Sequence, residues 1–112
     1  MRYACIYHPA PSNQGAPSPE HMAAMGALVA RFMKSGELIV TEPLAGPEAG
    51  CRVERSDGRF SVSDLAGRAG GYAILQADSR EGVIALAEQF LEVAGDGACE
   101  IRQIIDMGPP QG

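Results

Sequence analysis

The chain has 112 residues, of which 46% are hydrophobic, with a net charge of −5 and a pI near 4.9. This length predicts one domain that buries a core without the help of disulfides or metals. The acidic balance argues against a nucleic-acid binder, because such proteins concentrate basic residues on one face. The longest apolar run, residues 22–30, is about half of what a membrane span needs, and the start MRYACIYHPAP has no hydrophobic signal core. We therefore expect a cytoplasmic protein that binds neither nucleic acid nor membrane.

The chain opens with an expected strand over residues 2–8, in which Tyr3, Cys5 and Tyr7 share one face and His8 ends the other. Residues 9–17 contain three prolines, which remove backbone donors and predict a long loop. Loops of this kind often border sites, although a plain connection is the commoner case.

Ser18 and Pro19 predict the start of a helix, as a hydroxyl N-cap and a proline at the first helical position. Gly36 predicts its end. His21 lies at the edge of the expected apolar face rather than on the polar side. That face consists of Met22, Met25, Leu28, Val29, Phe32 and Met33.

A second strand is expected over residues 37–41. Two further strands, 51–55 and 59–63, flank Asp57-Gly58, the favoured pair for a tight hairpin turn. Acidic residues interleave with the arginines around this hairpin, which favours a solvated hairpin over a phosphate site. The arginines are Arg52, Arg55, Arg59 and Arg68.

The last third reads as strand, helix and strand. Residues 71–77 form a short apolar strand, and Asp78 with Glu81 has the spacing of a capping box for a helix that begins near Ser79. Gly95 predicts a left-handed stop, and residues 99–106 alternate as a strand with two different faces. The apolar helix face is expected to hold Val83, Ile84, Ala87, Phe90, Leu91 and Ala94, with Glu88, Gln89 and Glu92 outward.

These elements predict one α+β domain over residues 1–107, a ferredoxin-like antiparallel sheet with both helices on one face and the hairpin as an insertion, followed by a flexible tail at 108–112. The strands carry apolar residues on both faces, so the uncovered face needs a lid. We expect a homodimer that stacks sheet against sheet.

Several stretches resemble the YCII-related superfamily, and within it the DGPF-domain branch. The start MRYACIY resembles the opening strand of that family, and residues 18–22 with 32–38 resemble its first helix and the turn into its second strand. Residues 71–75, 85–87 and 100–102 resemble its C-terminal half. The motif is incomplete: residues 63–71 keep Asp64 of the Asp-Gly-Pro-Phe segment but replace the rest, and the connection is shorter.

The resemblance implies a dimeric α/β-barrel fold, a His/Asp pair in some relatives, and dehydrochlorinase activity in one branch. Some DGPF proteins are also similar to domains associated with extracytoplasmic-function sigma factors. Whatever the complete signature does is altered in this chain.

His21 is the first candidate for a general acid or base, with Asp64 as the orienting carboxylate, because an imidazole titrates near neutrality and a carboxylate fixes its tautomer. The alternative is a histidine tucked against the first helical turn. The candidate substrate-binding residues are Tyr7, His8, Glu42 and Arg102. His8 also fits a merely solvated position, and Arg102 fits an ion pair with a strand or a second subunit.

Cofactors and metals are not expected. The three cysteines, Cys5, Cys51 and Cys99, show no C-x-x-C spacing and fit reduced structural thiols. Residues 67–71 are glycine-rich, but a strand rather than a helix follows, so a P-loop is rejected. We predict a homodimer that binds a small aromatic or anionic molecule and performs lyase- or isomerase-type chemistry through His21 and Asp64. The alternative is a non-catalytic dimeric accessory or regulatory protein, linked to a sigma factor.

Overall fold

The computed structural model describes residues 1–108, so residues 109–112 of the predicted tail lie outside it. Eight elements make up most of the chain: β1 (Arg2–Pro9), α1 (Pro19–Ser35), β2 (Leu38–Pro43), β3 (Arg52–Ser56), β4 (Arg59–Ser63), β5 (Gly71–Gln76), α2 (Arg80–Ala94) and β6 (Gly97–Gln103). Two short 3₁₀ helices, η1 (Pro11–Asn13) and η2 (Pro47–Ala49), interrupt the loops after β1 and β2. Within residues 1–108, neither α-helix is long and apolar enough to cross a membrane.

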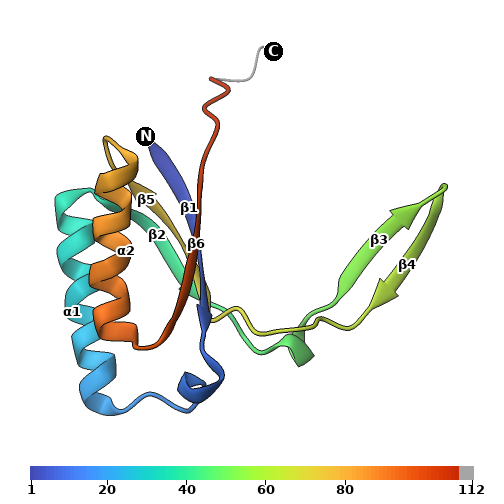
Figure 1. Cartoon of the computed structure of the whole chain (residues 1–112), viewed down its shortest axis with the longest axis horizontal. Coiled ribbons are helices and arrows are strands. Elements are labelled where there is room, and N and C mark those ends of the chain that lie inside the picture. Colours follow the sequence, from blue (N-terminus) through green and yellow to red (C-terminus); the bar gives the residue numbers. More distant parts are fainter. Residues whose placement is uncertain (109–112) are drawn as a thin grey trace.

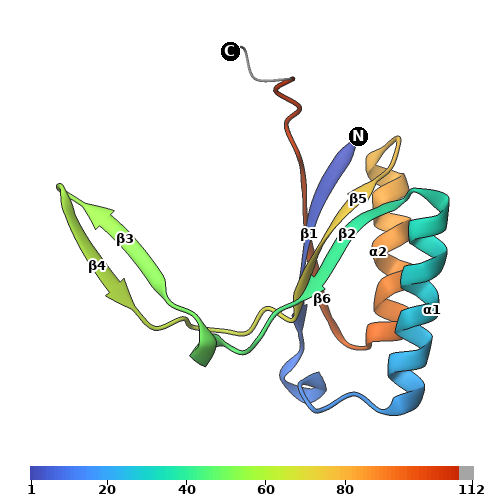
Figure 2. The ribbon, with the colours of Figure 1, turned by 180° about the vertical axis from the view of Figure 1, so that it is seen from behind.

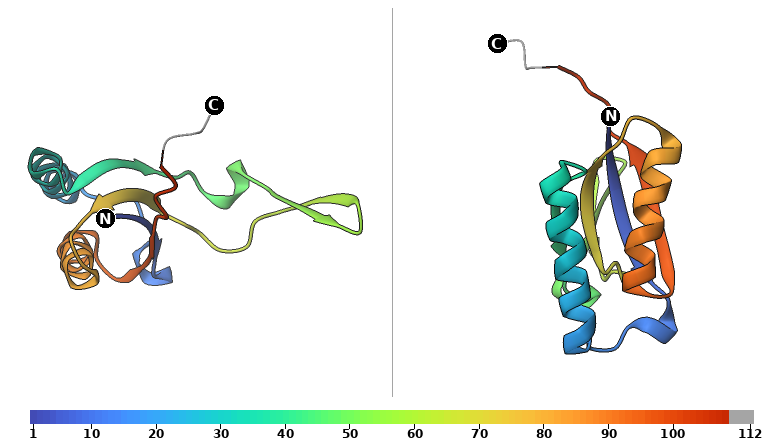
Figure 3. Two further views of the ribbon diagram at one scale, coloured as in Figure 1. Left: turned by 90° about the horizontal axis from the view of Figure 1, so that it is seen from above. Right: turned by 90° about the vertical axis from the view of Figure 1, so that its left-hand side faces the viewer.

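Four strands form one antiparallel sheet in the order β2-β5-β1-β6, and both α-helices cover the same face of it (Figure 1). The two helices lie side by side, with the sheet behind them (Figure 3, right). This arrangement confirms the predicted α+β, ferredoxin-like fold with the hairpin as an insertion.

The helix ends follow from their capping residues. The Ser18 hydroxyl accepts a hydrogen bond from the His21 backbone N–H at 3.1 Å, and Gly36 stops α1 with φ of 82°. For α2 the predicted capping box is wrong, because Ser79 rather than Asp78 is the N-cap and accepts from the Gly82 N–H at 3.1 Å. The helix therefore begins at Arg80.

The core lies between the helices and the covered face of the sheet, where Val83 is 1% exposed. Its buried members are Tyr3, Cys5, Leu28, Phe32, Leu38, Leu75, Val83 and Leu86. Met22, Met33 and Ile84 were predicted on the apolar faces, but they are 61%, 48% and 37% exposed. These three lie at the margins of the two apolar arcs, where a single layer of sheet does not reach them.

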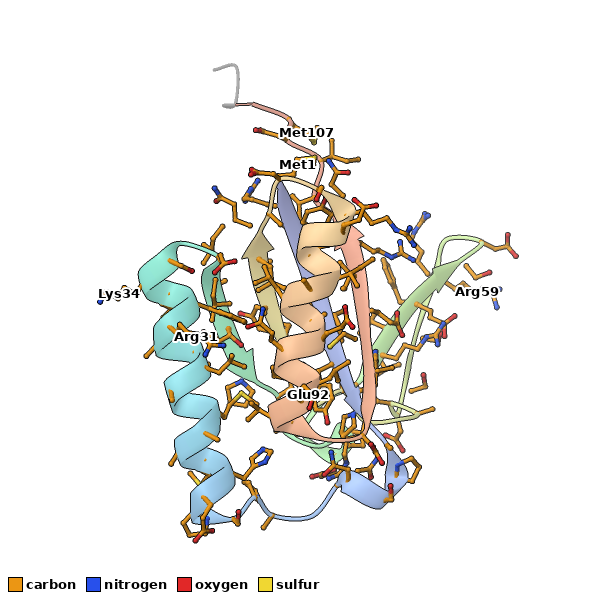
Figure 4. All side chains as sticks on the ribbon, turned by 60° about the vertical axis from the view of Figure 1, so that its left-hand side comes forward. Met1, Arg31, Lys34, Arg59, Glu92 and Met107 are labelled. Carbon is orange, nitrogen blue, oxygen red and sulfur yellow. The ribbon has the colours of Figure 1, made fainter. Side chains whose placement is uncertain are left out.

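Charged side chains project from the outer surfaces of both helices. Arg31 and Lys34 project from α1 and Glu92 from α2, on the side away from the sheet (Figure 4). The Arg31 guanidinium also donates a hydrogen bond to the side-chain oxygen of Gln89 at 3.1 Å, and this bond joins the two helices at their surface.

Strands β3 and β4 form a hairpin, residues 52–63, that projects away from the rest of the molecule (Figures 1 and 2). We call this hairpin the arm. Asp57 and Gly58 form its tip with φ of 52° and 77°, the left-handed pair that a tight hairpin turn requires. Every residue of the arm is exposed, which confirms the solvated hairpin. At its base, the Leu44 N–H donates to the Gly70 carbonyl at 3.0 Å.

The second face of the sheet has no helix on it, and the arm projects on this side (Figure 1). By strand register it presents Ala4 and Ile6 of β1 beside Tyr72 and Ile74 of β5. Ile6 is 41% exposed. We call this surface the open sheet face.

Candidate functional site

A cavity of about 920 Å³ lies between the helices and the covered face of the sheet. It reaches the end of the molecule where α1 begins and where β1 and β2 finish. Its inner part is apolar, with Leu28 and Phe32 of α1 facing Leu75 of β5. Polar residues gather at the outer part, among them Tyr7, Ser12, Asn13, Gln14, Ser18, His21 and Thr41. An apolar pocket with a few convergent polar groups is the usual form of a small-molecule site.

His21 is the third residue of α1 and lines the outer part of this cavity. The Ser18 cap fixes its backbone, and its side chain is half-buried. Within the part of the chain that the structure describes, its imidazole forms no hydrogen bond or ion pair. The ring nitrogens are therefore available to a ligand.

Asp64, the predicted partner of His21, is exposed in the connection between β4 and β5 and does not line the cavity. The pairing of the two side chains stays a prediction. Arg68, four residues later, does line the cavity, together with Gly70 and Gly71.

Arg68 reaches this position because the two glycines pass close to neighbouring strands. A Cβ on Gly70 would lie 3.0 Å from the Tyr7 ring, and one on Gly71 would lie 2.9 Å from the Glu42 carbonyl oxygen. The Gly70 N–H donates to the Tyr7 carbonyl at 2.7 Å. Sequence reasoning missed Arg68 because it grouped this residue with the arginines of the hairpin; the Gly70-Gly71 pair was the signal that separates them.

Tyr7 belongs to the cavity wall, as its assignment to substrate binding requires. Its ring meets Phe90 edge-on, with centroids 5.1 Å apart, and its hydroxyl accepts a hydrogen bond from the Asn13 side-chain amide at 3.2 Å. Burial raises the pKa of the Tyr7 hydroxyl, against the opposing effect of the Asn13 hydrogen bond, and the negative charge of Asp96 raises it further. Tyr7 is therefore a neutral hydroxyl near pH 7.

Glu42 borders the cavity where β2 runs past it, but strand register puts its side chain beside Tyr72 on the open sheet face. The pKa of the Tyr72 hydroxyl is raised by desolvation, by the negative charge of Glu42 and by a hydrogen bond to that carboxylate. A role for Glu42 in substrate binding stays a prediction.

His8 and Arg102 lie on the open sheet face, on the side of the sheet away from the cavity. The His8 Nε2 is 3.1 Å from the Glu100 Oε1, with both side chains well exposed. Arg102 shares this face with Glu100, as the alternation of the last strand predicts. The assignment of His8 and Arg102 to substrate binding stays a prediction, and the geometry gives them no contact with the cavity.

Cys5 and Cys99 lie on the covered face of the sheet, and Cys5 reaches the inner cavity. A hydrogen bond from the Cys99 thiol lowers the pKa of Cys5, and that same bond raises the pKa of Cys99. Both are free thiols, as is exposed Cys51. In residues 1–108, no group of three His, Cys, Asp or Glu side chains is placed to hold a metal ion.

The solved structures include a protein of the same fold. The 5-chloro-2-hydroxyhydroquinone dehydrochlorinase from Burkholderia phenoliruptrix AC1100, in complex with 2,5-dihydroxybenzoquinone, superposes with a TM-score of 0.55 at 19% sequence identity, and the match covers 94% of each chain. No curated protein matches the chain.

The family comparison is more direct, because it rests on the sequence. The model of the YCII-related domain matches residues 1–108, which is nearly the whole chain and includes β1, both helices, the arm and β6. The chain belongs to the YCII-related domain family.

Proposed function

We propose that this protein binds a small anionic aromatic molecule in the cavity and acts on it by acid–base chemistry through His21. The cavity volume of about 920 Å³ lies within the usual range of roughly 300–1,000 Å³ for small-molecule sites. The apolar inner part suits a ring, and the polar outer part suits its oxygen substituents. The dehydrochlorinase of the same fold acts on a chlorinated hydroxyhydroquinone and is seen with a dihydroxybenzoquinone, which supports this substrate class.

The observation that carries the proposal is the free imidazole of His21 at the cavity wall. In an elimination, the imidazole takes a proton from the substrate. The electron pair of the broken O–H or C–H bond forms a new double bond, and the leaving group departs with its own bonding pair. In an isomerisation, the same imidazole returns the proton at a different atom.

Arg68 is proposed to hold the anionic oxygen of the ligand, because a guanidinium matches such groups through directional hydrogen bonds. Neither ion pair in residues 1–108 involves Arg68, so its charge is available. Tyr7, neutral and hydrogen-bonded to Asn13, would lie against the ring of the ligand.

Asp64 is proposed as the carboxylate that orients His21, on the family resemblance. It lies four residues before Arg68, which already lines the cavity, and Gly67 between them has φ of 82°.

The protein is also proposed to be a homodimer in which the open sheet faces of two copies stack. Half-buried Ile74 and Tyr72 surround exposed Ile6 on a surface that no helix covers. Uncovered apolar residues of this kind favour a partner surface. This dimer is independent of the chemistry proposed for the cavity.

The test is an NMR titration of the amide resonances with 2,5-dihydroxybenzoquinone. We expect shifts at the start of α1 and at the start of β5, the two segments that meet at the cavity. Shifts confined to the open sheet face or the arm, or no shifts at millimolar ligand, would contradict binding in the cavity.

A second test follows turnover of chlorinated hydroxyhydroquinones by released chloride. His21→Ala is expected to lower the rate by about 10²-fold or more. Asp64→Asn is expected to lower it less, and the matched Asp57→Asn at the arm tip leaves it unchanged. A His21→Ala variant that binds the ligand and keeps the full rate would show that turnover does not depend on His21.

The second candidate is a non-catalytic dimeric accessory protein. The observation that favours it is the arm, which carries exposed apolar residues and does not line the cavity. Absence of ligand binding together with a stoichiometric partner on a pull-down would support this reading.

A further inference from the structure

The arm has one apolar and one polar face. Strand register sets Val53 opposite Val62 and Arg55 opposite Phe60, and these four residues share one face because side chains alternate along a strand. The polar face holds Arg52, Glu54 and Ser61, with Arg52 and Glu54 in an ion pair at 3.0 Å.

The apolar face is among the most exposed apolar surfaces of the described chain. Val53, Val62 and Phe60 are 62%, 69% and 73% exposed. A lone two-stranded hairpin is marginally stable in water, and a contiguous apolar patch on it marks an interaction surface. The arm projects away from the helices and the sheet (Figures 1 and 2), so these parts of the same chain do not cover its apolar face.

Charge indicates what covers it. The arm carries three arginines against one glutamate and one aspartate, a net charge of +1, while the whole chain carries −5. The rest of the chain therefore carries −6. A weakly basic, apolar arm is complementary to the acidic body of a second copy, and Arg55 lies within the apolar face to meet it.

Position points to the same occupant. The arm leaves the body on the side of the open sheet face, so a second copy stacked on that face would lie beside the arm (Figure 1). In a two-fold dimer each copy supplies one arm and receives one, which closes the assembly.

We infer that the arm clasps a second copy of this chain, with Val53, Phe60 and Val62 packed against the acidic body of that copy. This inference rests on the homodimer proposed above and adds an exchanged element to it. Sheet stacking alone would leave both arms in solvent.

The test uses the absence of tryptophan from the sequence. Phe60→Trp places a single tryptophan on the apolar face, and Arg59→Trp places one on the polar face as the control. We expect the emission of Phe60→Trp to be blue-shifted at concentrations where sedimentation velocity gives a dimer, and to move to longer wavelength on dilution to monomer. The emission of Arg59→Trp is expected to stay at long wavelength throughout.

Paired substitutions give the energetic test. Phe60→Ser with Val62→Ser is expected to raise the dimer dissociation constant by at least about tenfold, whereas Ser61→Ala leaves it unchanged. Circular dichroism checks that both variants keep the fold, as expected because the exposed arm contributes no residue to the core.

Each remaining outcome overturns the inference. If the protein is a dimer but the Phe60→Trp emission stays at long wavelength, the dimer forms without the clasp. A monomer at all concentrations removes both the dimer and the clasp. A blue shift in that monomer means that the arm folds back on its own chain.

Discussion

Asn13 donates a hydrogen bond from its side-chain amide to the Tyr7 hydroxyl at 3.2 Å, and this contact holds the loop after β1 against the end of that strand. The same nitrogen lies 2.8 Å from the Ala94 carbonyl oxygen and 3.1 Å from that of Asp96. One amide thus joins a strand end, a 3₁₀ turn and a helix end at the outer part of the cavity.

Asn13→Ala should therefore lower the free energy of unfolding by about 1–3 kcal/mol, since it removes a part-buried donor from the Ala94 carbonyl at the end of α2. Urea unfolding measures the loss. Gln14→Ala is the matched control, because Gln14 forms a single exposed bond of 3.3 Å to the Pro9 carbonyl. Equal effects of the two variants would show that Asn13 does not fasten the loop.

Tyr7 predicts a loss of stability in alkali. Burial raises its pKa in the folded chain above the value of about 10 in the unfolded chain, so the folded chain holds this proton more tightly. The stability linked to Tyr7 is fully present below about pH 10 and is lost as the pH rises through the folded-state pKa. Urea unfolding across this range should show a shallower decline for Tyr7→Phe than for wild type. The pKa of Tyr72 is also raised, but this residue contributes equally to the declines of the wild type and of Tyr7→Phe. Parallel declines would contradict the shift at Tyr7.

Gly97 is expected to tolerate no side chain. A Cβ there would lie 2.6 Å from the His8 carbonyl oxygen and 2.8 Å from the Tyr7 ring. Gly97→Ala should therefore cost about 1–3 kcal/mol, as overpacking does when backbone is the obstacle. Gly15→Ala meets nothing within 4 Å and should be neutral or slightly stabilising. Thermal unfolding compares the two, and a stable Gly97→Ala would show that β1 and β6 can move apart there.

The N-cap of α2 can be assigned by mutation. Ser79→Ala removes the oxygen that accepts from the Gly82 N–H and should cost about 1 kcal/mol. Asp78→Ala should cost clearly less. The reverse order in urea unfolding would restore the capping box at Asp78 and Glu81.

Arg68 provides a test of the ligand class. Arg68→Gln should weaken the binding of 2,5-dihydroxybenzoquinone by at least about tenfold, because a charge-assisted hydrogen bond contributes roughly 1.5–3 kcal/mol. Arg55→Gln on the arm keeps the net charge equal to that of Arg68→Gln and should leave binding unchanged. Isothermal titration calorimetry measures both, and equal affinities would remove Arg68 from the site.

Local signals in the sequence were sufficient for most of the fold. Ser18-Pro19 and Asp57-Gly58 act within a few residues of themselves, so the start of α1 and the tip of the arm could be predicted and are confirmed. The capping of α2 was missed by one residue because Asp78 and Ser79 are both good caps, and only the conformation of the chain before the helix selects between them.

The cavity was harder to predict because it depends on contacts between distant segments. Asn13 and Ala94 are 81 positions apart, and nothing near Asn13 in the sequence indicates that a helix ends beside it. The periodicity of α1 likewise placed Met22 in the core, although it is 61% exposed on the first turn beside the cavity. The place of His21 at the edge of a helical face could be predicted because it is a local property, and this residue lines the cavity.

The hydrogen bond between Leu44 and Gly70 brings together the two points where the arm leaves and rejoins the body. The residues between them form a loop whose two ends are held together by this bond. Lengthening that loop therefore adds only slowly to the entropy cost of folding. Insertions, deletions or a transplanted hairpin within the arm, residues 52–63, which contributes no residue to the cavity lining, are therefore compatible with the same sheet and cavity. The arm is a part of this domain that evolution, or a protein engineer, can rewrite independently of the core.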